Sequence, residues 1–253
     1  AVIPYKSLTE RDFKTTFIEE GELFLDLAGV YAMPIAIDPL VLYYNRDLLS
    51  AEGQPQPIEY WDEIYAAATN LSKMDAAGNL VSSVIALGEA SNIPHAKDIL
   101  SLLLLQAGTP ITSFIEGELR PQISSNLIMS VSRGESALNF YTQFSNPTRV
   151  YYSWNRSLVD AKTHFTSGDS AYYIGFASEL RVIKSKNPTL NFGIAPVPQS
   201  RVSGKEITFG RLRAVAISRG TSNPTAALAA ATALVSREST LTLSEILLLP
   251  PPR

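Results

Sequence analysis

The sequence predicts an α/β fold, because strand-like and helix-like segments alternate along nearly its whole length. Short runs rich in β-branched and aromatic residues, such as 80–88 (LVSSVIALG) and 171–176 (AYYIGF), indicate buried strands. Segment 58–71 lies between strand-like runs and repeats its apolar residues at a spacing of three and four, which is typical of an amphipathic helix. No fixed repeat period is visible, so we expect helices packed on a sheet and not a solenoid.

Further elements follow from periodicity, glycine and proline. Helices are expected at 95–108, 136–146, 157–170, 178–188 and 224–238, with Gly108 ending the first and Pro224 near the start of the last. The remaining strands are expected at 31–37, 40–44, 191–199 and 207–218, and residues 109–126 are expected to be loop with a small hairpin. A helix start is expected at 7–13 (SLTERDF), where Ser7 or Thr9 would be the N-cap.

Composition excludes several classes of function. The 253 residues are 45% hydrophobic and 18% charged, which is typical of one large or two modest globular domains. A net charge of −3 without a basic block argues against nucleic acid as a partner. There is no cysteine, and the sequence contains only two histidines, His95 and His164, which argues against a multi-histidine metal centre. No dinucleotide or phosphate-loop motif occurs, so no cofactor and no metal are expected.

The stretch 31–49 (YAMPIAIDPLVLYYNRDLL) places one acid, Asp38, within an apolar run. Pro34 indicates an edge or crossing segment at 31–37, and we expect a separate strand after Pro39. A second proline-stiffened passage occurs at 195–199. These two passages predict two lobes, one built from 1–37 and 200–253 and the other from 38–199. Both ends of the chain, AVIPYKSLTE and LLLPPPR, lead us to expect missing material.

Six segments follow one another along the chain: YAMPIAIDPLVLYYNRDLL, PQPIEYWDEIYAAATNLSK, FTSGDSAYYIG, NPTLNFGIAPVPQ, TFGRLRAVAIS and SNPTAALAAATALVS. Their order resembles the extracellular solute-binding proteins of ABC importers, in the sugar-binding group that contains maltose-binding protein. The similarity covers nearly the whole chain. The departures are Ile58-Glu59-Tyr60-Trp61 in place of a proline-threonine-tryptophan lead, and Ser170-Ala171-Tyr172-Tyr173 in place of small residues and methionine.

This resemblance implies a two-lobe periplasmic-binding-protein-like fold of type II with an incomplete first lobe. It implies a carbohydrate ligand in an interlobe cleft, hinge closure, and delivery of the ligand to ABC permease subunits, without catalysis. The location would be extracellular or periplasmic, with a lipid anchor upstream of residue 1 as the only expected membrane contact.

Candidate ligand contacts combine the resemblance with local patterns. Asp38 falls where the sugar binders place an acid, although an Asp–Pro turn that caps nearby amides is the alternative. The loop 87–98 follows a strand end, where ligands bind in α/β sheets, and it contains Glu89, Asn92 and His95. The alternative for this loop is a purely structural role, with Asn92 capping the next helix.

The other candidates are aromatic residues and the return strand. Trp154 would stack on a sugar ring, as an exposed tryptophan in a loop suggests, or fill a gap, and Phe176 lies near the family's stacking aromatic. Gly210 and Arg211 would offer backbone and guanidinium groups, whereas the alternative for Arg211 is a surface charge on an edge strand.

Three further interpretations stay open from the sequence: a non-sugar solute, a sensor partner, and a glycoside-acting enzyme. The enzyme interpretation has little support, because no motif marks an acid, base or nucleophile, and FTSGDSA lacks the glycine–x–serine–x–glycine pattern.

Overall fold

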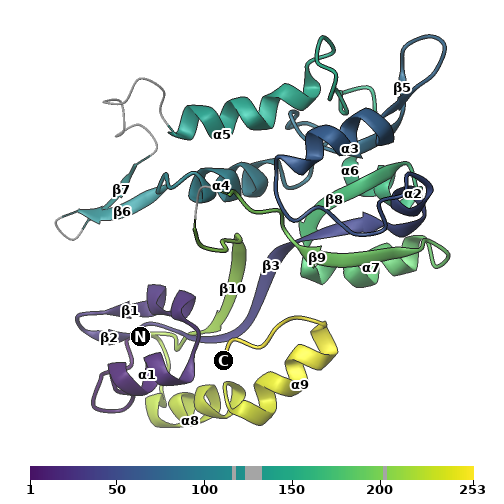
Figure 1. Ribbon diagram of the computed structural model, residues 1–253. Coiled ribbons are helices and arrows are strands. Elements are labelled where there is room, and N and C mark those ends of the chain that lie inside the picture. Colours follow the sequence, from purple (N-terminus) through teal and green to yellow (C-terminus); the bar gives the residue numbers. More distant parts are fainter. Residues whose placement is uncertain (116–117, 123–132, 202–203) are drawn as a thin grey trace. The chain divides into compact units, whose positions relative to one another are not determined.

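The computed structural model describes residues 1–115, 118–122, 133–201 and 204–253 (Figure 1). The chain divides into two compact units: unit 1, formed by Ala1–Pro39 and Gly210–Arg253, and unit 2, formed by Leu40–Phe209. The mixture of helices and strands confirms the expected α/β class. The division into lobes at 37/38 and 199/200 stays a prediction.

Unit 1 surrounds a small apolar core. Thr9 caps the first helix by accepting a hydrogen bond from the Asp12 amide, as its Ser/Thr-rich start predicts. Asn223 caps α8 in the same way, and Pro224 occupies its first turn. The elements are α1 (Glu10–Thr16), η1 (Glu19–Phe24), β1 (Leu25–Asp26), β2 (Gly29–Val30), the first part of β3 (Met33–Asn45), β10 (Gly210–Val215), α8 (Pro224–Leu234) and α9 (Arg237–Leu247). The core consists of Ile3, Phe13, Phe17, Val30, Met33, Ile217, Ala231 and Val235.

Strand β3 is one continuous element of 13 residues, so the expected break into two strands at Asp38-Pro39 is wrong. Residues 33–39 pair antiparallel with β10, and residues 40–45 pair with strands of unit 2. Among the described residues, β10 is the only strand that pairs with residues 33–39. Proline lacks an amide hydrogen, but it is tolerated in a strand where that hydrogen would face an unpaired edge. Pro34 and Pro39 therefore do not interrupt β3.

Unit 2 is organised around β8 (Ser170–Phe176), whose seven residues are all buried. On one side β8 pairs antiparallel with β3, and on the other it pairs parallel with β5 (Leu80–Ile85). β9 (Phe192–Pro196) pairs with the free edge of β3, and β4 (Lys73–Met74) extends the sheet beyond β5. The expected strands at 80–88, 171–176 and 191–199 are thus present; β5 and β9 are shorter than expected, and β8 begins one residue earlier.

Helices accompany this sheet at the expected positions, and α3 packs on β5 while α6 packs on β8 (Figure 1). Asn45 ends β3 and caps the next helix by accepting from the amides of Asp47 and Leu48. The expected hairpin is β6 (Thr112–Ile115) with β7 (Glu118–Pro121), and the expected loop at 123–126 lies outside the described residues. The helices are α2 (Arg46–Ala51), α3 (Glu63–Leu71), α4 (Ala96–Gln106), α5 (Arg133–Thr142), η2 (Gln143–Ser145), α6 (Ala161–Thr166), η3 (Ala177–Glu179) and α7 (Leu180–Lys186). None of the described helices has the length and apolarity that a membrane-spanning helix needs.

An aromatic cluster fills one part of the core of unit 2. The Phe165 ring lies 6.4 Å from the ring of Tyr43, 5.8 Å from Tyr173 and 6.2 Å from Phe192, measured between centroids. The side chains of Phe165 and Tyr43 are fully buried. Contacts between aromatic rings at these separations stabilise a core beyond the burial of their area.

We predict that Phe165→Ala lowers the free energy of unfolding of unit 2 by about 3–5 kcal/mol, because it removes a buried ring and leaves a cavity. Urea unfolding followed by tryptophan fluorescence measures this, since Trp61 and Trp154 both lie in unit 2. Val159→Ala is the control, because Val159 is exposed and should change stability by less than about 0.5 kcal/mol. Equal stability of the two variants would contradict the proposed packing.

Candidate functional site

The parallel pairing of β5 with β8 determines where the candidate site lies. Ser83 is the register partner of Ser170, and Ile85 is the partner of Tyr172, so both strands end at the same edge of the sheet. Ligands of α/β proteins bind outside the carboxyl ends of such strands. Five of the residues predicted from the sequence occupy the loops at this edge or contact them: Glu89, Asn92, His95, Trp154 and Phe176.

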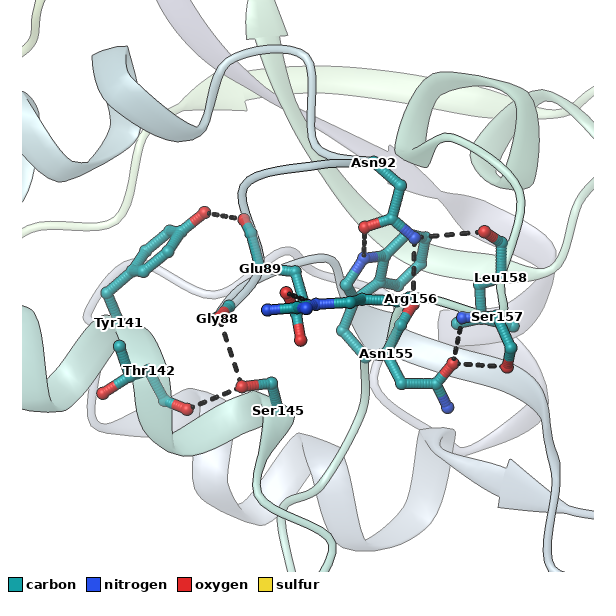
Figure 2. A network of polar contacts seen from close by, with 11 residues as sticks. Gly88, Glu89, Asn92, Tyr141, Thr142, Ser145, Asn155, Arg156, Ser157 and Leu158 are labelled. Atoms are coloured by element: carbon teal, nitrogen blue, oxygen red, sulfur yellow. Dashed lines mark hydrogen bonds and ion pairs between the residues drawn. The ribbon is translucent and has the colours of Figure 1, made fainter.

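Hydrogen bonds from α5 and η2 hold the loop after β5 in place (Figure 2). Tyr141 donates its hydroxyl to the carbonyl of Glu89 at 2.6 Å, and Ser145 donates to the carbonyl of Gly88 at 3.2 Å. Gly88 has φ +97°, and a Cβ there would lie 2.8 Å from Ser145. This position therefore requires glycine both for its backbone conformation and for the close approach of η2.

Asn92 joins this loop to the segment 154–158 (Figure 2). Its amide nitrogen donates to the carbonyls of Asn155 and Leu158, at 2.9 and 3.1 Å, and its oxygen accepts from the indole of Trp154 at 3.0 Å. The Asn92 side chain is thus engaged in positioning the loops. It does not cap α4, because the N-cap residue of that helix is His95, whose side chain makes no capping hydrogen bond.

Two aromatic candidates are buried in the core, and for Trp154 this agrees with the gap-filling alternative. Trp154 is fully buried, and its ring lies 5.2 Å from that of His164 in a T-shaped arrangement. Phe176 is 1% exposed and lies 4.9 Å from the His95 ring, also edge to face. Trp154 is therefore not an exposed loop residue. Each ring fills the interior directly beneath the candidate site.

Glu89 and Arg156 form the charged pair at the surface of the site (Figure 2). The Arg156 Nε donates to a carboxylate oxygen of Glu89 at 2.7 Å. The side chain of Arg156 is 78% exposed, whereas that of Glu89 is 16% exposed. The hydrogen bond to Glu89 raises the pKa of Arg156. The sequence pattern did not single out Arg156, although it lies two residues after Trp154 in the aromatic segment 151–157 (YYSWNRS).

Beneath the surface, Glu179 collects three donors at the end of β8. One carboxylate oxygen accepts from His95 Nε2 at 2.9 Å and from Lys162 at 3.0 Å, and the other accepts from the Tyr173 hydroxyl at 2.7 Å. The Nδ1 atom of His95 lies 3.7 Å from Asp98. The sequence pattern did not single out Glu179, because two of its partners, Lys162 and His95, are 17 and 84 residues away.

These contacts determine the charge state of the network. Burial alone would raise the pKa of Glu179, but the hydrogen bonds from His95, Tyr173 and Lys162 outweigh it and lower the pKa to about 2. Burial, followed by the charge of Glu179, raises the pKa of Tyr173. Glu179 is therefore a carboxylate and Tyr173 a neutral donor at neutral pH.

The remaining candidates, Asp38, Gly210 and Arg211, belong to unit 1. Asp38 is 2% exposed and lies within β3, so the alternative of an Asp–Pro turn is wrong. Its register partner across the β3–β10 pair is Arg211, which is exposed, and Gly210 is the partner of Pro39. Among the described residues, no group of three or more His, Cys, Asp or Glu side chains is placed to hold a metal ion.

Comparison with known proteins gives a family and a fold. A family model described as "Bacterial extracellular solute-binding protein" matches residues 6–253. A comparison with curated proteins found no match.

Several solved structures are similar in fold. A cyclo/maltodextrin-binding protein complexed with maltotetraose is 19% identical with a TM-score of 0.74, and the alignment covers 100% of this chain and 60% of that chain. The maltose-maltodextrin binding protein of Alicyclobacillus acidocaldarius is 16% identical with a TM-score of 0.69 and coverages of 100% and 60%. An ABC transporter solute-binding protein of Thermotoga lettingae bound with α-D-tagatose is 19% identical with a TM-score of 0.67 and coverages of 99% and 62%. The chain thus spans about 60% of the length of the structures it matches.

We predict that Glu179→Gln lowers the free energy of unfolding at pH 7 by about 3 kcal/mol, since each pKa unit corresponds to about 1.4 kcal/mol. The folded-state pKa of about 2 lies below the ordinary 4.5. The stabilisation is therefore fully present above pH 4.5 and is lost as the pH falls toward 2.

Urea unfolding between pH 7 and 3 measures this difference, which should narrow as the pH falls. Glu206→Gln is the matched control, because Glu206 is exposed. A constant difference between Glu179→Gln and the unmodified chain over this pH range would contradict the assignment.

Proposed function

This chain belongs to the family of bacterial extracellular solute-binding proteins, and we propose that it binds a carbohydrate and delivers it to the permease of an ABC transporter. The observation that supports the proposal most directly is the gathering of Glu89 and Arg156 at the carboxyl edge of β5 and β8. In this proposal the protein binds its solute without converting it, and it acts outside the cytoplasm, in the periplasm or at the cell surface. A lipid anchor and hinge closure of an interlobe cleft stay predictions.

The chemistry of the pair suits a polyhydroxyl ligand. A sugar presents adjacent hydroxyl groups that both donate and accept hydrogen bonds. The Glu89 carboxylate accepts, and the Arg156 guanidinium donates from the groups that do not bond Glu89. Because the two groups already hold each other at 2.7 Å, little side-chain conformational freedom is lost when a ligand joins them.

The buried aromatic residues change the proposed contact set. Trp154 and Phe176 are buried in this structure, so we propose that they support the loops and that polar groups provide the contacts from unit 2. Asp38, Gly210 and Arg211 stay proposed contacts from unit 1. The similar structures carry maltotetraose and α-D-tagatose, which favours a carbohydrate over another solute. A non-sugar solute, a sensor partner and a glycoside-acting enzyme are the alternatives.

We predict that one sugar in a panel of monosaccharides and oligosaccharides raises the thermal unfolding temperature of this chain. A ligand at 100 times its Kd stabilises the folded state by about 2.7 kcal/mol, because it binds only that state. The measurement is a thermal-shift screen that includes polyols and phosphodiesters. The carbohydrate proposal would be wrong if only a non-sugar solute shifted the transition. Turnover of chromogenic glycosides by the same sample would favour the enzyme instead.

We further predict that Glu89→Gln and Arg156→Gln each weaken binding of that sugar about tenfold or more, because a hydrogen bond to a charged group contributes about 1.5–3 kcal/mol. Asp38→Asn tests the contact from unit 1 in the same titration. Arg149→Gln is the control, since Arg149 is an exposed arginine of the same unit. Isothermal titration gives the affinities, and an effect of the control equal to that of Arg156→Gln would contradict the site.

A further inference from the structure

Unit 2 contains a pocket that shares no residue with the candidate site. It lies among α3, α4, α5 and the segment 199–201, and its volume is about 450 Å³. This volume falls within the range of small-molecule sites in proteins. The lining residues are Trp61, Asp62, Tyr65, Leu103, Gln106, Ala107, Ser136, Ala137, Phe140, Gln199, Ser200 and Arg201.

Aromatic rings form the inner wall of this pocket. The Phe140 ring lies 5.5 Å from the Trp61 ring and 6.2 Å from the Tyr65 ring, in T-shaped arrangements with both. Leu103 and Ala137 complete the wall with aliphatic surface. Edge-to-face ring clusters of this kind offer both ring faces and ring edges to a further ring.

Two amide side chains of the lining are already engaged in hydrogen bonds. Gln106 accepts from the indole of Trp61 at 2.6 Å and donates to the carbonyls of Pro198 and Ile207, at 3.0 and 2.9 Å. Gln199 accepts from the Ile207 amide at 2.8 Å and donates to the Val197 carbonyl, also at 2.8 Å. A polyhydroxyl ligand would have to displace these bonds, and each buried polar group left unpaired costs free energy.

A charged cluster lies at one side of the rim: Arg201 and Asp62 line the pocket, and Glu63 lies beside them. The Arg201 guanidinium lies 3.8 Å from the centroid of the Tyr60 ring. Its Nε donates to both carboxylate oxygens of Asp62, at 3.1 and 3.0 Å, and another nitrogen donates to Glu63 at 2.9 Å. One cation thus meets two carboxylates. This three-residue cluster carries a net negative charge, which disfavours an anionic ligand and favours a neutral or cationic one.

We propose that this pocket binds a small aromatic ligand that is neutral or positively charged. Its aromatic wall matches an apolar ring, its engaged amides select against saccharides, and the acidic cluster at one side of its rim selects against carboxylates and phosphates. The pocket is separate from the proposed carbohydrate site, so binding at one does not require binding at the other.

Fluorescence distinguishes the two sites, because the chain contains two tryptophans. In Trp154→Phe the remaining Trp61 reports on the pocket, and in Trp61→Phe the remaining Trp154 reports on the candidate site. Phenethylamine, phenylacetate and methyl glucoside are the probes. In Trp154→Phe we expect saturable quenching by phenethylamine, with a Kd at least about tenfold lower than that of phenylacetate and no saturation with methyl glucoside.

A blocking variant provides the second measurement, which keeps both tryptophans. Ser136 is exposed and lines the pocket, so Ser136→Phe should place a ring in its mouth. Leu138→Phe is the matched control on the same helix, since Leu138 is 47% exposed and does not line the pocket.

By isothermal titration, Ser136→Phe should weaken phenethylamine binding at least about tenfold, whereas Leu138→Phe should leave it within about twofold. Thermal unfolding checks that both variants are folded. Absence of phenethylamine binding, equal binding of phenylacetate, preferential binding of methyl glucoside, or equal effects of the two variants would each overturn the proposal.

Discussion

The parallel pairing of β5 with β8 is the constraint on which the candidate site depends. β8 is buried along its whole length between an antiparallel neighbour, β3, and this parallel neighbour. A parallel pair must be joined by a crossover, so the loops that leave its carboxyl ends come from distant parts of the sequence and still meet at one edge. Without that pairing, Glu89 and Glu179 would have no reason to lie on the same side of the sheet.

The Glu179 network shows how this edge is held together. A carboxylate removed from water costs several kcal/mol unless donors replace the lost hydration. Here the donors come from β8 itself, from α6 and from the residue before α4, so the network joins three elements beneath the candidate site. Because all three donors contact one side chain, the loops after β5 and β8 cannot shift independently without leaving a buried charge unpaired. The network therefore positions the surface pair of Glu89 and Arg156 without itself needing to contact a ligand.

Local sequence patterns were sufficient to predict most of the helices and strands, but they predicted little of the candidate site. The strand within 80–88 and the helix within 95–108 could be predicted from the sequence, because periodicity and turn residues act over a few positions. The break expected at Asp38-Pro39 failed because the effect of a proline depends on whether its missing donor faces a partner strand, which is a tertiary property. The burial of Trp154 could not be predicted for a similar reason. Its indole donates to Asn92, which is 62 residues away, and no local sequence pattern predicts that hydrogen bond.

The two tryptophans illustrate how a polar partner decides what an aromatic side chain does. Both indoles donate to an amide oxygen, Trp154 to Asn92 and Trp61 to Gln106. At Trp154 the acceptor belongs to a loop above the sheet, so the bond completes the core and leaves the ring fully buried. At Trp61 the acceptor is the last residue of α4, and the wall beside it is completed by Phe140 of α5 and not by a strand. The helices around Trp61 leave a pocket of about 450 Å³, whereas the Trp154 ring is fully buried. The same donor and the same type of acceptor thus produce a closed core in one place and an open pocket in the other, and the difference lies in the elements that surround each ring.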